Sequence, residues 1–246
     1  MTSTFFISDI HVGLQDKRSE QQKLDSLERL FAIISAEGRS LYMLGDILDY
    51  WMEFRHVIPK GFTRFFCLLS GLVRSGVEVV YIAGNHDFYL GRFFQEELGV
   101  QTLCGMHEAC IGGRKFVLAH GDGLGKGDLG YKIFATVIRH PFNIALLSGF
   151  HPDLAVGLMK GYSLHSRENK PDTRVRDSAR LLDFAEKMAG EKDFDYFICG
   201  HNHARGITNL RKGKTYVNLG SWIDGSRSYG VFHDGVMELR EVQISR

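Results

Sequence analysis

Two histidines flank one asparagine near the C-terminal end of the sequence, in the stretch Gly200-His201-Asn202-His203. The apolar run at 194–198 directly before it is typical of a buried strand. Imidazole is the commonest metal ligand in proteins. A His-x-His pair also occurs in surface loops without any function, so the pair predicts metal chemistry only if other ligand-type side chains reach the same place.

Four other predicted strands end in the same kind of polar stretch. These stretches are Ser8-Asp9-Ile10-His11, Gly45-Asp46-Ile47-Leu48-Asp49, Gly84-Asn85-His86-Asp87 and His120-Gly121-Asp122. Each alone is ordinary chemistry of turns and helix caps. In α/β folds, however, the carboxyl ends of neighbouring strands converge on one crevice. Five such strand ends therefore favour one composite site over five unrelated turns.

The ligand types in these stretches indicate which chemistry the site performs. Carboxylate, imidazole and amide oxygen without thiolate suit Mn, Fe, Zn or Mg. Seven such groups exceed the needs of one ion and fit two ions that share a bridging carboxylate. Two ions about 3.5–4 Å apart clamp phosphoryl oxygens and make hydroxide available near neutral pH. The sequence thus predicts a dinuclear centre for phosphoryl chemistry, with one of the two histidines at 201 and 203 on each ion.

Short apolar runs and helical patterns alternate through most of the chain, as the positioning of these motifs requires. The predicted strands are 4–7, 41–44, 77–82, 115–119 and 194–198, followed by 215–219, 229–232 and 237–244. Helical spacing of apolar residues predicts helices around 24–34, 65–73 and 175–188. Alternation followed by a β-rich end predicts an α/β protein with two packed mixed sheets between helices.

The composition excludes several classes of protein. The 246 residues, 44% hydrophobic and 24% charged, are ordinary for a globular chain of one large or two small domains. A net charge of +1 argues against binding to nucleic acid. The four cysteines lack CxxC spacing, which predicts buried thiols in a reducing compartment. No signal peptide and no run of about 18–20 apolar residues is visible, so we expect a cytoplasmic, soluble protein.

The ordered set D-x-H, GD, GNHD, HGD and GHxH, which spans Asp9 to His203, resembles the calcineurin-like metallophosphoesterases. The resemblance implies a four-layer α/β/β/α sandwich of two mixed sheets, with 1–246 as a single domain and a dinuclear site. Matched motif by motif, the first ion would be held by Asp9, His11 and His203. The second would be held by Asn85, His120 and His201, and Asp46 would bridge the two. His86 would assist the leaving group or steady the phosphoryl oxygens, and Asp87 would orient it.

Within this family, the chain is most similar to the UDP-2,3-diacylglucosamine pyrophosphatases of lipid A biosynthesis. The similarity rests on SDIHVG, GDILDYW, GNHDFYLGRFF, HGDGLGKGDLGY and a late NLGSW. It implies that UDP-2,3-diacylglucosamine is cleaved to UMP and 2,3-diacylglucosamine 1-phosphate with two divalent ions, Mn²⁺ above all. That branch usually carries arginine, as GNRD, where this chain has His86.

The branch also has a helical insertion before the GHxH strand, and residues 129–170 match it as a helical lid. The first half of 129–170 is rich in apolar and aromatic residues. Between 126 and 180 the sequence has nine Lys/Arg and five Asp/Glu, an excess of positive charge. This combination suits acyl chains, phosphates and the anionic cytoplasmic face of the inner membrane, where we expect peripheral association. An ordinary helical cap that completes the core is the alternative. The resemblance places five residues near the substrate: Asp128, Tyr131, Ser163, Arg167 and Lys170.

Three functions remain open from the sequence. The first is the metal-dependent pyrophosphatase that acts on a lipid-linked nucleotide sugar, without an obligate protein partner. The second is a metallophosphoesterase for a soluble nucleotide or another phosphodiester. The third is a catalytically inactive scaffold of the same fold. A scaffold predicts broken ligands, whereas all seven ligand-type residues are present together with His86 and Asp87.

Overall fold

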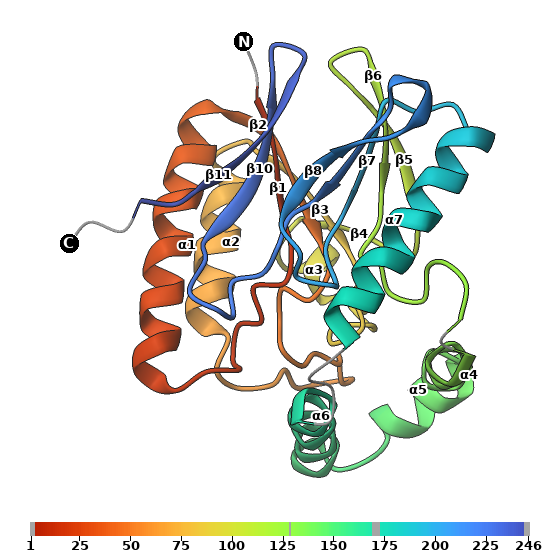
Figure 1. The fold of residues 1–246 in the computed structure, drawn as a ribbon. Helices are drawn as coiled ribbons and strands as arrows, with labels where there is room; N and C mark the ends of the chain where they lie inside the picture. Colours follow the sequence, from red (N-terminus) through yellow and green to blue (C-terminus); the bar gives the residue numbers. More distant parts are fainter. Residues whose placement is uncertain (1–2, 128, 169–172, 244–246) are drawn as a thin grey trace.

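Two β-sheets packed face to face form the centre of the protein (Figure 1). The computed structural model describes residues 3–127, 129–168 and 173–243. The first sheet has the order β11-β10-β1-β2-β3-β4. Its strands are β1 (Ser3–Ile7), β2 (Gly38–Leu44), β3 (Glu78–Ile82), β4 (Gln101–Leu103), β10 (Ser228–His233) and β11 (Val236–Glu241).

The second sheet has the order β5-β6-β7-β9-β8. Its strands are β5 (His107–Ile111), β6 (Arg114–Leu118), β7 (Tyr196–Cys199), β8 (Gly206–Asn209) and β9 (Thr215–Asn218). Strands β1 to β4 are parallel, as are β6, β7 and β9, while β10, β11, β5 and β8 pair antiparallel at the margins. Both sheets are therefore mixed, as the sequence predicted.

Alternating side chains of the strands build the layers of the sandwich. In β1, Phe6 points between the sheets, where its ring stacks on Phe116 of β6 at 5.9 Å between centroids. Its neighbour Phe5 belongs instead to the core under helices α1 (Lys17–Glu37) and α2 (Thr63–Arg74). Helix α7 (Thr173–Glu191) covers the outer face of the second sheet, where Leu181 packs in the cluster that includes Phe197. The predicted α/β/β/α sandwich is confirmed.

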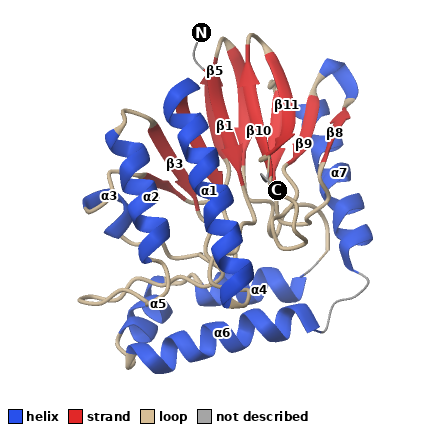
Figure 2. Cartoon of the chain, turned by 90° about the vertical axis from the view of Figure 1, so that its left-hand side faces the viewer, coloured by secondary structure: helices blue, strands red, loops and turns tan. Residues whose placement is uncertain are grey.

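Three further helices lie together at one end of the sheets, beside the loops that follow the parallel strands (Figure 2). They are α4 (Leu129–Ile138), α5 (Pro141–Ser148) and α6 (Pro152–Glu168), here called the α4–α6 segment. The chain also contains a short helix α3 (Phe93–Glu96) and a 3₁₀ turn η1 (Arg211–Gly213). Among the described residues, no helix is long and apolar enough to cross a membrane.

The cysteines differ from the expectation of four buried thiols. Cys199 is buried, but Cys67, Cys104 and Cys110 are exposed. Cys67 lies on the solvent side of α2, Cys104 follows the edge strand β4, and Cys110 lies on the edge strand β5. Edge positions have no neighbouring strand to cover them, and apolar composition alone does not reveal this.

Candidate metal centre

Loops after five parallel strands bring all seven predicted ligand residues to one place. Three groups of residues have ligand atoms that all lie within 4.8 Å of one another: Asp9, His11 and His203; His11, Asp46 and His86; Asp9, Asp46 and His120. Asn85 and His201 join them, because Asn85 Oδ1 lies 3.1 Å from His120 Nε2 and 3.0 Å from His201 Nδ1. Convergence of distant loops at this edge is what the strand-end pattern predicted.

Asp46 lies at the centre of the cluster. Its Oδ1 accepts hydrogen bonds from the backbone N–H groups of Asn85 and His86, both at 2.9 Å. Its Oδ2 faces imidazoles, 3.4 Å from His120 Nε2 and 3.7 Å from His11 Nε2. Oδ1 of Asp46 thus holds the loop after β3. Oδ2 faces His120 on one side and His11 on the other, which is the position of a carboxylate that could contact a metal ion on either side.

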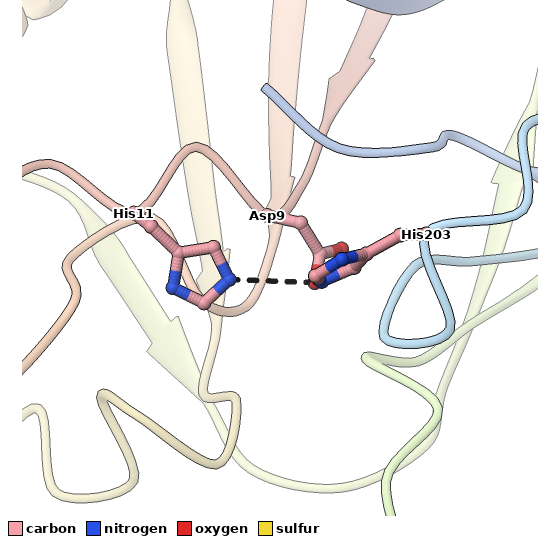
Figure 3. Close-up of side chains that lie close together, drawn as sticks. All are labelled: Asp9, His11 and His203. Atoms are coloured by element: carbon pink, nitrogen blue, oxygen red, sulfur yellow. Dashed lines mark ion pairs between the residues drawn. The ribbon is translucent and has the colours of Figure 1, made fainter. Parts of the chain in front are cut away.

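Asp9 plays the corresponding part on the side of the His-x-His pair. It is fully buried, and its Oδ2 accepts from the backbone N–H of His201 at 2.9 Å. Its Oδ1 lies 3.2 Å from Nε2 of His203 and 3.9 Å from Nε2 of His11 (Figure 3). Side chains from β1 and β7, one from each sheet, therefore meet here.

The backbone of these loops is strained in order to present the side chains. Seven non-glycine residues of the described chain have positive φ, and five of them belong to the cluster: Asp9, His11, Asp46, His201 and His203. Each such conformation costs about 1–3 kcal/mol and is typical of functional sites. Glycines make room for the loops, since a Cβ on Gly84 would lie 2.3 Å from Asp46 Oδ1, and one on Gly200 would lie 2.0 Å from Asp9 Oδ2.

Burial and charge set the protonation of the cluster. Burial lowers the pKa of His11 and of His201 to about 4, so both rings are neutral at pH 7. Burial alone would raise the pKa of Asp46, but attraction to His120, His86 and His11 outweighs it and holds that pKa well below the ordinary value. Neutral imidazole and ionised carboxylate are the forms that coordinate divalent metals.

The orientation of the histidines also fits a metal centre. His120 Nδ1 lies 2.8 Å from the carbonyl oxygen of Leu44, and His11 Nδ1 lies 3.2 Å from Asp49 Oδ1. Each ring therefore uses Nδ1 on a backbone or carboxylate oxygen and turns Nε2 toward Asp46, the arrangement usual for metal-binding histidines. The buried thiol of Cys199 is not aimed at the cluster, because its Sγ contacts Tyr216 and Asn218.

His86 is oriented by Asp49 and not by Asp87. His86 Nδ1 lies 2.9 Å from the carbonyl oxygen of Asp49, which leaves Nε2 toward the cluster. The fully buried carboxylate of Asp87 accepts instead from Tyr81 and from the backbone N–H groups of Gly84, Asp46, Ile47 and Leu48. The prediction that Asp87 orients His86 was therefore wrong. Asp87 ties the loop after β2 to the loop after β3.

The role of Asp87 can be measured as stability. We expect Asp87→Ala to lower the free energy of unfolding by at least about 3 kcal/mol. The reason is that several buried N–H donors lose their acceptor, each at about 1–3 kcal/mol. Urea unfolding measures the change. Asp193→Ala, which removes an exposed carboxylate paired with Lys115, is the control and should leave the unfolding midpoint unchanged. A midpoint for Asp87→Ala equal to that of wild type would contradict this role.

Two of the five predicted substrate residues contact the cluster from the α4–α6 segment. Tyr131 donates to Asp122 Oδ2 at 2.7 Å, and the buried Ser163 donates to Asp49 Oδ2 at 2.8 Å. Asp128 and Lys170 lie outside the described residues, and so does the side chain of Arg167. Asp49 and Asp122 were not predicted as site residues, although Asp49 ends the GDILD stretch and Asp122 ends the HGD stretch.

Two cavities adjoin the cluster. The first, about 180 Å³, lies between the cluster and the α4–α6 segment and has a mainly apolar lining. Its lining includes Asn85, His86, Phe88, Tyr131, Phe134, Ile138, Leu147, Ala155, Leu158 and Met159. The second, about 300 Å³, is bordered by His120 and Asp122 together with Phe88, Tyr89, Met106 and Ile144. The helical segment therefore contributes apolar surface directly next to the ligand cluster.

Other apolar side chains of the segment face solvent instead. Phe142 is 68% exposed, Leu146 53% and Leu154 55%, and Leu129, Ile133 and Val137 are also exposed. The segment thus has an apolar inner side on the cavity and an apolar outer side in solvent, which periodicity alone does not separate.

Several known proteins are similar to this chain. Residues 2–205 match the family model of the calcineurin-like phosphoesterases. A Porphyromonas gingivalis protein named UDP-2,3-diacylglucosamine hydrolase is 33% identical over 259 aligned positions, which cover 97% of each chain. A Haemophilus ducreyi protein of the same name is 25% identical and covers 90% of this chain and 92% of its own. A dimetal phosphatase from Danio rerio superposes with a TM-score of 0.46 at 16% identity, over 98% of this chain and 95% of its own.

The family match covers most of the sequence, from the first strand to the His-x-His loop, and the relative at 33% identity spans nearly all of it. The carboxylate, imidazole and amide groups that converge in this cluster are ligand types that divalent ions bind. This chain belongs to the calcineurin-like phosphoesterase family and is a metal-dependent hydrolase.

Proposed function

We propose that this protein hydrolyses the diphosphate of UDP-2,3-diacylglucosamine to give UMP and 2,3-diacylglucosamine 1-phosphate. The observation that carries the proposal is the apolar cavity, which is bordered by Asn85 and His86 on one side and by the α4–α6 segment on the other. A soluble nucleotide would have no use for such a lining. The names of the two relatives, which match over nearly the whole chain, agree with it.

In this proposal the cluster would hold two divalent ions, taken here as Mn²⁺, with the ligands divided as the family motif implies. Asp9, His11 and His203 serve one ion, Asn85, His120 and His201 serve the other, and Asp46 serves both. Ions bound by these residues would supply hydroxide near neutral pH and would neutralise phosphoryl oxygens. His86, held through Nδ1 by Asp49, presents Nε2 to the phosphoryl group or the leaving oxygen.

The α4–α6 segment acts as a lid in the same proposal, as an insertion at 129–170 within one domain of residues 1–246. Its inner side takes the acyl chains, and Tyr131 and Ser163 border the polar part of the substrate. The family resemblance implies the same role for Asp128, Arg167 and Lys170, whose side chains lie outside the described residues. Its exposed apolar outer side and its excess of basic residues suit peripheral binding to the cytoplasmic face of the inner membrane.

Substrate selectivity tests the proposed function. With Mn²⁺ and a mild detergent, kcat/KM for the diacylated UDP-sugar should exceed that for UDP-N-acetylglucosamine by at least about 10², because each buried methylene contributes about 0.8 kcal/mol before ordering costs. Steady-state release of UMP measures both. Equal rates on the two substrates would favour the soluble-nucleotide phosphoesterase instead.

A matched pair of variants in α5 locates the acyl site. Leu147 lines the cavity, whereas Phe142 is 68% exposed. Leu147→Asp should lower the rate on the diacylated substrate at least about tenfold through lost apolar contact and buried charge. Phe142→Asp should change it less than about threefold in detergent, where no bilayer contributes. Both variants should still cleave a small chromogenic phosphodiester. Loss of that activity as well would place the damage at the metal centre.

A further inference from the structure

Arg139, directly after α4, reaches from the α4–α6 segment to the metal centre. Its Nη2 donates to Asp122 Oδ2 at 2.8 Å and to the carbonyl oxygen of Gly84 at 3.0 Å. Gly84 directly precedes Asn85, and Asp122 follows His120 by two residues. The guanidinium is therefore fixed against two of the three loops proposed to supply ligands on the Asn85 side of the cluster, the third being the loop of His201.

The same residue borders both cavities. Arg139 lines the apolar cavity together with Asn85 and His86, and it lines the second cavity together with His120 and Asp122. Both of its side-chain hydrogen bonds to described residues use Nη2, which leaves the N–H groups of Nε and Nη1 for a ligand. Two orienting bonds on one nitrogen fix the plane of a guanidinium, the geometry in which arginine recognises phosphate.

Asp122 keeps this cation charged and in place. Burial alone would lower the pKa of Arg139, but the neighbouring carboxylate of Asp122 prevails and raises it. Tyr131 donates to the same oxygen of Asp122, so two residues of the α4–α6 segment hold one carboxylate. A permanent positive charge thus lines both cavities, next to the ligand cluster.

A diphosphate needs a cation in that position. If the ions hold the phosphoryl group that is attacked, the second phosphate lies beyond them and needs its own partner. We infer that Arg139 binds the β-phosphate of the diphosphate substrate and stabilises it as the leaving group. This inference rests on the proposed function, and it assigns the residue that separates diphosphate substrates from simple phosphodiesters.

The charge balance of the step explains why the position matters. The oxygen of water forms a bond to the α-phosphorus while the bond from that phosphorus to the bridging oxygen breaks. The electron pair of the broken bond remains on the β-phosphate, and both protons of water are released as the two products become dianions. Negative charge therefore grows on the group that faces Arg139, where a fixed donor stabilises the transition state more than the ground state.

Binding of UDP and UMP to the Mn²⁺-loaded enzyme tests the assignment directly. The two nucleotides differ by the β-phosphate alone. Arg139→Met should weaken UDP at least about tenfold in Kd, equivalent to about 1.4 kcal/mol, and change UMP less than about threefold. Isothermal titration calorimetry measures both. Lys132→Met is the control and should leave the binding of both nucleotides unchanged. Lys132 is a cation of the neighbouring helix α4, and its Nζ donates to the carbonyl oxygen of Gly125.

Kinetics give a second, independent readout. In Arg139→Met, kcat for the diacylated UDP-sugar should fall at least about tenfold. The rate on a p-nitrophenyl phosphodiester, whose leaving group carries no phosphate, should change less than about threefold. Arg139→Lys should recover part of the loss, because it keeps the charge without the planar donor set. Arg139→Met that weakens UDP and UMP equally, or neither, overturns the assignment.

These outcomes are separable from failure of the proposed function. A wild-type enzyme that does not cleave the diacylated UDP-sugar refutes that substrate, while the comparison of UDP with UMP still decides the role of Arg139. If wild type cleaves both substrates and Arg139→Met loses equal activity on the diphosphate and on the chromogenic diester, the proposed function stands. The β-phosphate role of Arg139 is then refuted, and the residue only links α4 to the loops.

Discussion

Replacing Asp46 with alanine is expected to lower turnover by at least about 10⁴-fold, equivalent to about 5.5 kcal/mol of transition-state stabilisation, and to reduce bound metal. The reason is the position of its Oδ2, which lies 3.4 Å from His120 Nε2 on one side and 3.7 Å from His11 Nε2 on the other. Asp46 also belongs to two of the three ligand groups. Its loss therefore removes a carboxylate from both proposed ion positions together. Elemental analysis and hydrolysis of a chromogenic phosphodiester measure the two effects.

A second variant separates the ligand role of Asp46 from its structural role. Asp46 Oδ1 holds the backbone N–H groups of Asn85 and His86, so alanine also leaves two buried donors without an acceptor. Asp46→Asn keeps one carbonyl oxygen for these donors while it removes the negative charge. It should fold as wild type by circular dichroism and still lose metal and at least about 10³-fold in rate. Two ions per chain in Asp46→Asn, or turnover within a few-fold of wild type, would contradict a shared ligand at this position.

The placement of the ligand residues could be predicted because the strands that carry them have strong local patterns. Runs such as 41–44 and 194–198 are short, mostly apolar and followed within two residues by glycine and then by polar residues. Parallel strands of one sheet end at the same edge, so convergence within each sheet follows from the strand assignment alone. The five strand ends form one cluster because the two sheets, one with β1 to β3 and the other with β6 and β7, pack face to face.

The short strands at the margins could not be predicted in the same way. Strands β4, β5 and β8 have three to five residues with mixed polarity, and β8 reads Gly-Ile-Thr-Asn. Each is a strand because a neighbouring strand supplies its hydrogen-bond partners, as β9 does for β8 and β6 for β5. That stabilisation is tertiary, so no periodicity in the strand itself records it.

The residues that orient the ligands were hidden for a related reason. Asp49, Asp87 and Asp122 act through hydrogen bonds to groups far away in sequence, such as the bond between Ser163 and Asp49 across 114 residues. An aspartate after a strand has the same local signature whether it binds a metal, holds a loop or caps a helix. The sequence therefore predicted which residues converge but not the hydrogen bonds that support them, and the contacts of Arg139 depend on how α4 lies against the loops.

His86→Ala is expected to keep its metal content and to lose about 10²–10⁴-fold in rate, the usual range for a group that transfers a proton or steadies a phosphoryl oxygen. The geometry supports a role in the reaction, since Nδ1 is held by the carbonyl oxygen of Asp49 and the ring lines the apolar cavity. A competing role as a metal ligand also has support, because His86 belongs to the group with His11 and Asp46. Metal content distinguishes the two roles, and rate alone does not.

Three variants together decide between these roles. His56→Ala, in an exposed loop, is the control and should leave both metal content and rate unchanged. His86→Arg should retain more activity than His86→Ala, since guanidinium also donates to phosphoryl oxygen and the similar branch carries arginine at this position. An ammonium or guanidinium group does not coordinate a metal while it is protonated, so recovery by arginine is incompatible with a ligand. Loss of one ion per chain in His86→Ala, without recovery in His86→Arg, would make His86 a ligand and leave the phosphoryl group to Arg139 and the metal centre.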